Sequence, residues 1–123
     1  MINRKEAIVA LYFELMHAHL ADVKAGRSKV LGLKDISDKM HIQVRHLSNT
    51  VKNVTGKSPC FYFENELIKI SKELLGQSSN TISDVAFVFD YDPSNFTKFF
   101  KNYTGQTPTE YRKSLKTEPF TSK

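Results

Sequence analysis

The sequence has 123 residues, of which 18 are lysine or arginine and 13 are aspartate or glutamate, so its formal charge is +5. A hydrophobic fraction of 40% suits one small globular domain and excludes wholesale disorder. No apolar run approaches the ~20 residues of a membrane-spanning helix, and the N-terminus lacks the layout of a signal peptide. We therefore expect a cytoplasmic protein that makes no contact with a membrane.

The first predicted element is a helix over residues 3–24. Asn3 is followed three residues later by Glu6, which is the pattern of a capping box, and Gly26 stands just beyond the predicted end. Apolar residues cover much of the circumference of this helix. We expect the segment 1–29 to pack on the subdomain that follows it. Pairing with a second copy of the chain or with a separate sensor domain is the alternative.

An enzyme is not expected, because the sequence lacks a glycine-rich phosphate loop, a nucleophile elbow and a metal-ligand cluster. His17 and His19 are two residues apart on a helix, so they do not face one another and are interpreted as partly buried polar residues. Cys60 adjoins three aromatic residues and is interpreted as a packed thiol. As the only cysteine it also excludes an internal disulfide. We expect no cofactor and no bound metal.

The next predicted subdomain covers residues 30–58. A short helix is expected over 34–41 and a longer one over 43–54, ended by Gly56 as a left-handed C-cap residue. His41 stands in the turn between the two helices. Histidine is among the non-glycine residues enriched at positive φ, so it can take the conformation that such a turn needs.

A linker helix is predicted over 59–76, running from Pro59 to Leu75. Beyond it, a second subdomain over 77–117 repeats the scheme of the first, and the tail 118–123 is expected to be flexible. The signals of this subdomain are N-caps at Thr81, Asp92 and Thr107, a turn residue at Asp90, a C-cap at Gly105, and capping-box partners at Asp84 and Glu110.

The two subdomains are copies of one unit. A shift of 49 residues aligns 33–62 with 82–111 without a gap, and the apolar positions agree. The alignment predicts an all-α protein of seven helices, with two helix-turn-helix subdomains joined by the linker helix. A pair of ordinary helical hairpins is the alternative. The identical pairs are Asp35/Asp84, Lys52/Lys101, Asn53/Asn102, Thr55/Thr104, Gly56/Gly105, Pro59/Pro108 and Tyr62/Tyr111.

The second helix of each copy lacks acidic residues. No acid occurs over 43–58 or over 93–109, although both stretches carry lysine and polar side chains. A phosphate backbone would select such a face, and amide and hydroxyl groups can bind base edges. We therefore expect the partner to be double-stranded DNA. The candidate DNA-binding residues are Gln43, Arg45, His46, Ser48, Asn49, Lys52, Ser94, Asn95, Thr97, Lys98 and Lys101.

The stretch 82–112, ISDVAFVFDYDPSNFTKFFKNYTGQTPTEYR, resembles the C-terminal signature of AraC/XylS-type transcription regulators. The resemblance covers about residues 30–115 and implies an all-α domain whose two recognition helices enter successive major grooves. It also implies transcription activation through contact with RNA polymerase. Carried onto this sequence, it places Arg45, Ser48 and Asn49 at positions that face bases, and Lys52 and Lys101 nearer the phosphates.

Adjacent major grooves lie about 34 Å apart, so the predicted DNA site has two boxes about 10 bp apart. The site is asymmetric, because the two recognition helices differ in sequence. We expect a monomer on DNA, with a dimer through the N-terminal helix as the alternative. A helical protein-interaction module and a fragment of a larger ligand-sensing regulator are the other interpretations. An initiating methionine followed by a capped helix favours a stand-alone regulator.

Overall fold

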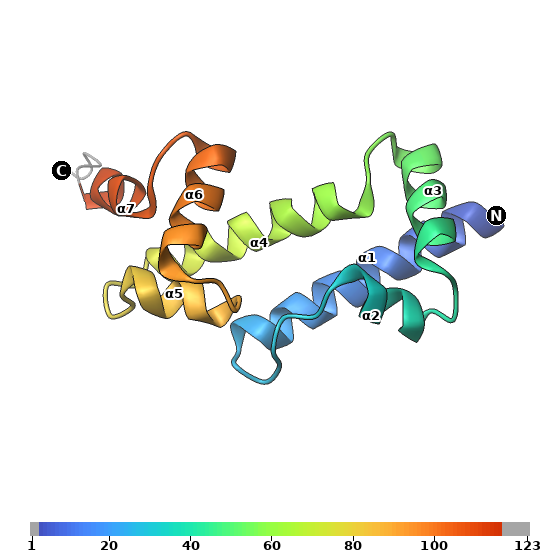
Figure 1. Cartoon of the computed structure of the whole chain (residues 1–123), viewed down its shortest axis with the longest axis horizontal. Coiled ribbons are helices and arrows are strands. Elements are labelled where there is room, and N and C mark those ends of the chain that lie inside the picture. Colours follow the sequence, from blue (N-terminus) through green and yellow to red (C-terminus); the bar gives the residue numbers. More distant parts are fainter. Residues whose placement is uncertain (1–2, 117–123) are drawn as a thin grey trace. The chain divides into compact units, whose positions relative to one another are not determined.

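The computed structural model describes residues 3–116, and this part of the chain folds into seven helices without a strand (Figure 1). The chain divides into two compact units, Met1–Leu67 and Ile68–Lys123, and the helix α4 begins in the first and ends in the second. The predicted all-α fold with two helix-turn-helix subdomains is confirmed. The predicted flexible tail, 118–123, lies outside the described residues. The helices are α1 (Arg4–Lys24), α2 (Leu33–Lys39), α3 (Val44–Thr55), α4 (Pro59–Leu75), α5 (Ile82–Val88), α6 (Pro93–Thr104) and α7 (Pro108–Lys116).

Helix α1 starts where its capping box predicts. The Asn3 side chain accepts the Glu6 N–H at 2.8 Å, and the Glu6 carboxylate accepts the Asn3 N–H at 3.1 Å. The short helix predicted over roughly 34–41 is α2, which runs from Leu33 to Lys39. His41 has a φ of 60°, which is incompatible with a right-handed helix, so α2 ends before it.

The core of the first unit forms where α1 packs against α2 and α3 (Figure 1). Tyr12 is fully buried, and its hydroxyl donates to the Pro59 carbonyl at 2.9 Å, which joins α1 to the start of α4. Burial raises the pKa of Tyr12, so the hydroxyl keeps its proton and remains a donor. The other buried apolar residues of this unit are Ile8, Val9, Met16, Leu20, Val23, Ile36, Leu47, Val51 and Leu67.

The loop between α1 and α2 is held by a buried histidine. Nε2 of His19 accepts the Leu31 N–H at 2.8 Å, and the His19 side chain is 8% exposed. Burial lowers the pKa of His19, and the positive charge of Lys39 lowers it further, against the opposing effect of Asp22 and Asp35. The neutral imidazole is therefore the form that fixes this loop.

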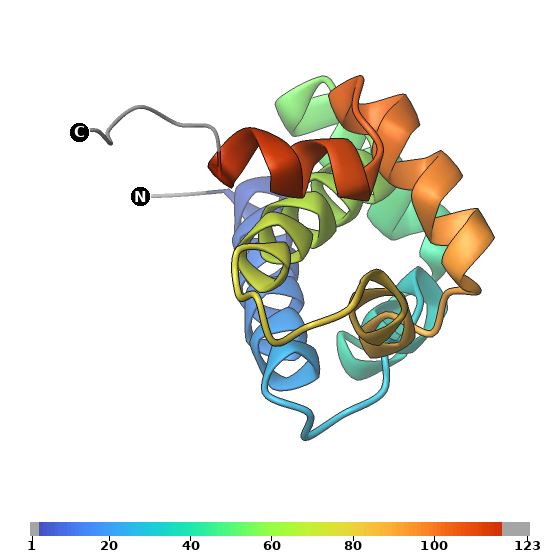
Figure 2. The same ribbon diagram turned by 90° about the vertical axis from the view of Figure 1, so that its left-hand side faces the viewer.

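In the second unit, α6 packs against both α5 and α7, and α5 and α6 run in clearly different directions (Figures 1 and 2). Aromatic rings fill the space between these helices. The ring centroid of Phe100 lies 5.7 Å from that of Tyr111 and 5.9 Å from that of Phe96. Arg112 of α7 donates through Nε to the Leu75 carbonyl at 3.0 Å, which ties α7 to the end of α4.

We expect Tyr12→Phe to destabilise the first unit by about 1–2 kcal/mol, because the substitution leaves a buried carbonyl without its donor. Tyr62→Phe is the matched control, since the Tyr62 ring packs edge-on against Phe13 at 4.9 Å and that contact is retained. Urea unfolding of the two variants measures the difference. Equal stabilities would contradict a structural role for the Tyr12 hydroxyl.

The depressed pKa of His19 predicts that acid destabilises the first unit. As the pH falls, the unfolded chain takes up the imidazole proton near pH 6.5, before the folded protein does. The contribution of neutral His19 to the free energy of unfolding is therefore complete above that pH and is lost as the pH falls through the folded pKa. Thermal unfolding between pH 7.5 and 5 measures the effect. His19→Gln retains an acceptor without a titrating group and should flatten the dependence.

Candidate nucleic-acid interface

Both helix-turn-helix units use the same turn. His41 has a φ of 60° and Asp90 a φ of 59°, so the left-handed conformation predicted for these two positions is confirmed. The next backbone N–H then returns to the first helix in each copy: Ile42 donates to the Ser37 carbonyl at 3.2 Å, and Tyr91 to that of Ala86 at 3.0 Å. The turn therefore sets the same direction for α3 after α2 and for α6 after α5.

The two second helices also end alike. Gly56 and Gly105 have φ values of 88° and 83°, and the N–H of each donates to a lysine carbonyl four residues earlier at 2.8 Å. The preceding threonine closes the end in both copies, because the Thr55 and Thr104 hydroxyls donate to the carbonyls of Val51 and Phe100 at 2.7 and 2.9 Å. Helices α3 and α6 thus have the same length and the same register along the 49-residue repeat.

A buried stripe fixes the rotation of each helix. Leu47 and Val51 of α3 and Phe96 and Phe100 of α6 are all 0% exposed. Residues four apart lie on one side of a helix, so burying these pairs turns the opposite side of the helix outwards. The side chains on that opposite side form the outer arc of each helix.

The outer arcs contain the predicted candidates. In α3 and its N-cap, the exposed side chains are Gln43, Arg45, His46, Asn49 and Lys52, and in α6 they are Ser94, Asn95, Lys98 and Lys101. Ser48 and Thr97, which are equivalent in the repeat, are half-buried at the edge of the arc. Each unit therefore brings its own candidates together on one helix face.

Two further residues lie on the same arcs and were not among the predicted candidates. Asn53 and Asn102 are exposed and occupy equivalent positions, and the repeat alignment already marked them as an identical pair. The Asn53 side-chain oxygen accepts from the Lys5 ammonium at 3.4 Å, which brings a further positive charge to the α3 arc. Sequence identity between the copies at an exposed position was the signal that could have found them.

Asp92 is an acid that lies next to the α6 arc. Asp92 caps α6, and its Oδ2 accepts the Ser94 N–H at 3.1 Å and the Ser94 hydroxyl at 2.5 Å. The hydrogen bonds from Ser94 lower the pKa of Asp92, so its carboxylate is ionised at neutral pH. In the first copy the equivalent residue is the neutral Gln43, which makes no side-chain cap.

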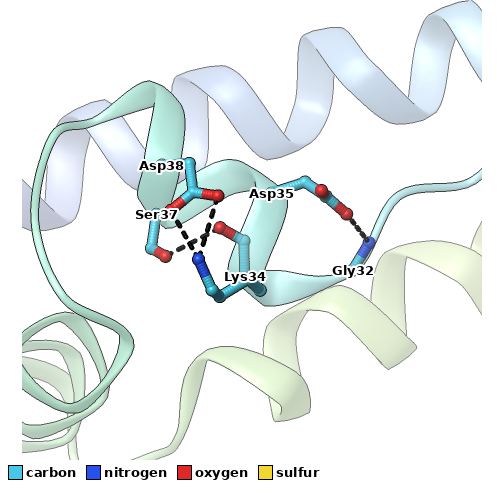
Figure 3. A network of polar contacts seen from close by, with 5 residues as sticks. All are labelled: Gly32, Lys34, Asp35, Ser37 and Asp38. Carbon is cyan, nitrogen blue, oxygen red and sulfur yellow. Dashed lines mark hydrogen bonds and ion pairs between the residues drawn. The ribbon is translucent and has the colours of Figure 1, made fainter.

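The acids of α2, beside the α3 arc, are engaged within their own helix (Figure 3). The Lys34 ammonium lies 2.9 Å from Asp38, and the hydrogen bond between them raises the pKa of Lys34. Asp35 accepts the Gly32 N–H at 3.2 Å at the start of α2. A shallow hollow of about 370 Å³ separates Lys34 and Asp38 from Gln43 at the N-terminus of α3.

The interpretation of Cys60 as a packed thiol is wrong, because Cys60 is exposed on the first turn of α4. The aromatic residues after it pack elsewhere: Phe61 and Tyr62 meet edge-on at 5.2 Å, and the Lys57 ammonium lies over the Phe61 ring. Among residues 3–116, no group of three or more histidine, cysteine or acidic side chains could hold a metal ion. Within the same range, no helix is both long and apolar enough to span a bilayer.

Two duplicated helix-turn-helix units with acid-free outer arcs define a DNA-binding protein of the transcription-regulator class. The profile of the family described as "Helix-turn-helix domain" matches residues 36–114. The chain belongs to this family, and it is an AraC/XylS-type DNA-binding domain rather than an enzyme.

The chain is similar to known proteins in sequence and in fold. The HTH-type transcriptional activator RhaS of Yersinia pestis is 27% identical over 89 residues, which cover 72% of this chain and 33% of RhaS. The chain spans about a third of the length of the curated relatives it matches. The C-terminal domain of AraT, a response regulator of Geobacillus stearothermophilus, superposes with a TM-score of 0.75 at 22% identity, covering 91% of this chain and 88% of that domain. The AdpA DNA-binding domain, solved in complex with a target DNA, gives a TM-score of 0.67 at 16% identity, covering 83% of this chain and 93% of that one.

Substitutions in the buried stripe should lower the free energy of unfolding, whereas substitutions on the outer arc should leave it nearly unchanged. We expect Leu47→Ala to cost about 2–5 kcal/mol, because it removes a fully buried side chain. Asn49 lies two residues further along α3 and is exposed, so Asn49→Ala should change stability by no more than about 0.5 kcal/mol. Urea unfolding measures both values. A large loss from Asn49→Ala would show that the arc is needed for folding.

Proposed function

We propose that this chain binds a specific double-stranded DNA site and regulates transcription there, with α3 and α6 as its two recognition helices. Each helix reads one of two successive major grooves, so the site has two boxes about 10 bp apart. The site is asymmetric because the residues on the two arcs differ. By contact with RNA polymerase beside a promoter, the bound protein activates transcription.

The observation that carries the proposal is that two helices with different sequences present the same kind of surface. Each buries one apolar pair completely and turns outwards an arc without a carboxylate of its own. A docking face for phosphates needs this arrangement, because carboxylates would be repelled by the DNA backbone. Its appearance at equivalent positions of a repeat indicates one role performed twice.

The similar proteins support the proposal. AdpA was solved with its DNA-binding domain on a target DNA, and RhaS is a transcriptional activator. The first favours DNA as the partner of the shared fold, and the second favours activation as the outcome.

Residues along each arc have different proposed roles. Arg45, on the first turn of α3, is placed to contact a guanine, because a guanidinium donates two hydrogen bonds to the O6 and N7 atoms of that base. Lys52 and Lys101, in the last turns of α3 and α6, carry a positive charge that suits phosphate contact. Of the eight remaining candidates, Gln43 and Ser94 lie at the N-terminal ends of α3 and α6. The other six lie further along the arcs or at their edges: His46, Ser48, Asn49, Asn95, Thr97 and Lys98.

A monomeric state on DNA is supported by the packing of α1. Its apolar side chains are used within the first unit, where α1 contacts α2 and α3. Leu11, at 41%, is its most exposed large apolar side chain among the described residues. Sedimentation over a range of protein concentrations tests this. A mass that doubles on concentration would instead support a dimer through α1.

Selection from random DNA duplexes, followed by footprinting, tests the bipartite site. We expect two unequal boxes about 10 bp apart, protected on one face of the duplex. A single short box, or an inverted repeat, would contradict reading by two different helices within one chain.

Binding should be steeply salt-dependent, and the two kinds of basic residue should differ. Arg45→Ala should cost about 1–3 kcal/mol on the selected site and relax the base preference at one position. Lys52→Ala should weaken binding to all sequences equally and reduce the slope of log K against log salt by about 1. Titrations at several salt concentrations measure both effects. A uniform loss for Arg45→Ala would reassign that residue to a phosphate.

A further inference from the structure

Equivalent positions on the two outer arcs differ in hydrogen-bonding chemistry. Arg45 in α3 and Ser94 in α6 are related by the 49-residue repeat and are both exposed on the first turn. An arginine side chain only donates hydrogen bonds, whereas a serine hydroxyl can donate one and accept others. The chemistry that Ser94 offers to DNA therefore depends on where its proton is held.

The hydroxyl proton of Ser94 is held by Asp92. Ser94 Oγ lies 2.5 Å from Asp92 Oδ2, and the same carboxylate oxygen accepts the Ser94 backbone N–H. An ionised carboxylate can only accept, so the hydroxyl is the donor in this bond. What remains available on the outward side of Ser94 Oγ is its lone pairs.

The Thr97 hydroxyl also donates its proton to an acceptor within the protein. The hydroxyl lies 2.9 Å from the Pro93 carbonyl, which can only accept, so the proton again points back into the helix. Thr97 is half-buried at the edge of the α6 arc, beside Ser94 along the helix surface. It presents a lone pair and a methyl group rather than a donor.

We propose that Ser94 reads a base amino group, adenine N6 or cytosine N4, in the box contacted by α6, with Asp92 as the residue that orients its hydroxyl. This inference rests on the proposed function. In the major groove, adenine and cytosine present amino donors, whereas guanine presents the O6 and N7 acceptors that lone pairs would repel. The two boxes thus differ in kind: guanine faces the donor Arg45, and an amino-bearing base faces the acceptor Ser94.

The test compares duplexes that differ at one base pair of the selected site. Ser94→Arg identifies that position, because it should convert the preference there to guanine. On the original chain we expect adenine or cytosine to be favoured over guanine at that position about tenfold. Ser94→Ala removes the acceptor, so the ratio should fall below about twofold.

Asp92→Ala tests the orienting role without touching the reading side chain. This substitution frees the Ser94 hydroxyl to turn and donate to guanine. The preference for adenine or cytosine over guanine at the tested position should therefore fall about threefold, even if the affinity for every duplex changes. Thr81→Ala is the matched control. It removes the N-cap of α5, where Thr81 Oγ1 accepts the Asp84 N–H at 2.9 Å, and should retain the original ratio.

Three results would overturn the inference. Selection of guanine at the position read by Ser94 in the original chain would overturn the inference. A bipartite site, and with it the proposed function, would remain. An unchanged ratio in Asp92→Ala would remove the orienting role of the carboxylate. Failure to select any site would remove the proposed function and this inference together.

Discussion

The structure depends on the complete burial of two residues, four apart, in each of the helices α3 and α6. With Leu47 and Val51, or Phe96 and Phe100, withdrawn from solvent, neither helix can rotate without exposing a large apolar side chain. Such exposure costs about 1.5–3 kcal/mol per residue, which a small domain can ill tolerate. The identity of the outward-facing residues is therefore a consequence of core packing, and surface residues are free to vary without moving the arc.

The place of each residue along α3 and α6 is fixed separately, by the residues at which the two helices begin and end. The left-handed residues His41 and Asp90 set where each second helix begins, and Gly56 and Gly105 set where it stops. Burial alone would allow a helix to begin a turn earlier or later. With both ends defined, the second, fifth and sixth residues of α3 and α6 occupy matching places, so comparing the copies residue by residue has a geometric basis.

The features that could be predicted from the sequence are the local ones. Caps, capping boxes, left-handed turn residues and apolar spacing act over three to five residues, and each has a residue-type signature. The contacts that could not be predicted join residues far apart, such as Tyr12 with Pro59 and His19 with Leu31. The mistake over Cys60 has the same origin, because its aromatic neighbours in sequence say nothing about which face of α4 is covered.

Within the site, the direction of a hydroxyl proton was also beyond sequence reasoning. Ser94 was identified as a candidate because serine can donate and accept, and only the position of its oxygen beside Asp92 removes one of those options. The capping role of Asp92 was predictable from the following proline. Its effect on a neighbouring side chain was not, because that effect depends on a distance rather than on a residue type.

The pattern of differences between the copies agrees with a division of labour along each arc. The pairs Lys52/Lys101 and Asn53/Asn102, towards the C-terminal end, are identical. The pairs Arg45/Ser94 and Asn49/Lys98, nearer the N-terminus, differ. A phosphate backbone is the same in every box, so residues that contact it have no reason to diverge. Bases change from box to box, and residues that read them must differ if the site is asymmetric. Under the proposed function, duplication of one scaffold preserves the residues that meet the phosphate backbone and varies the residues that read the bases of each box.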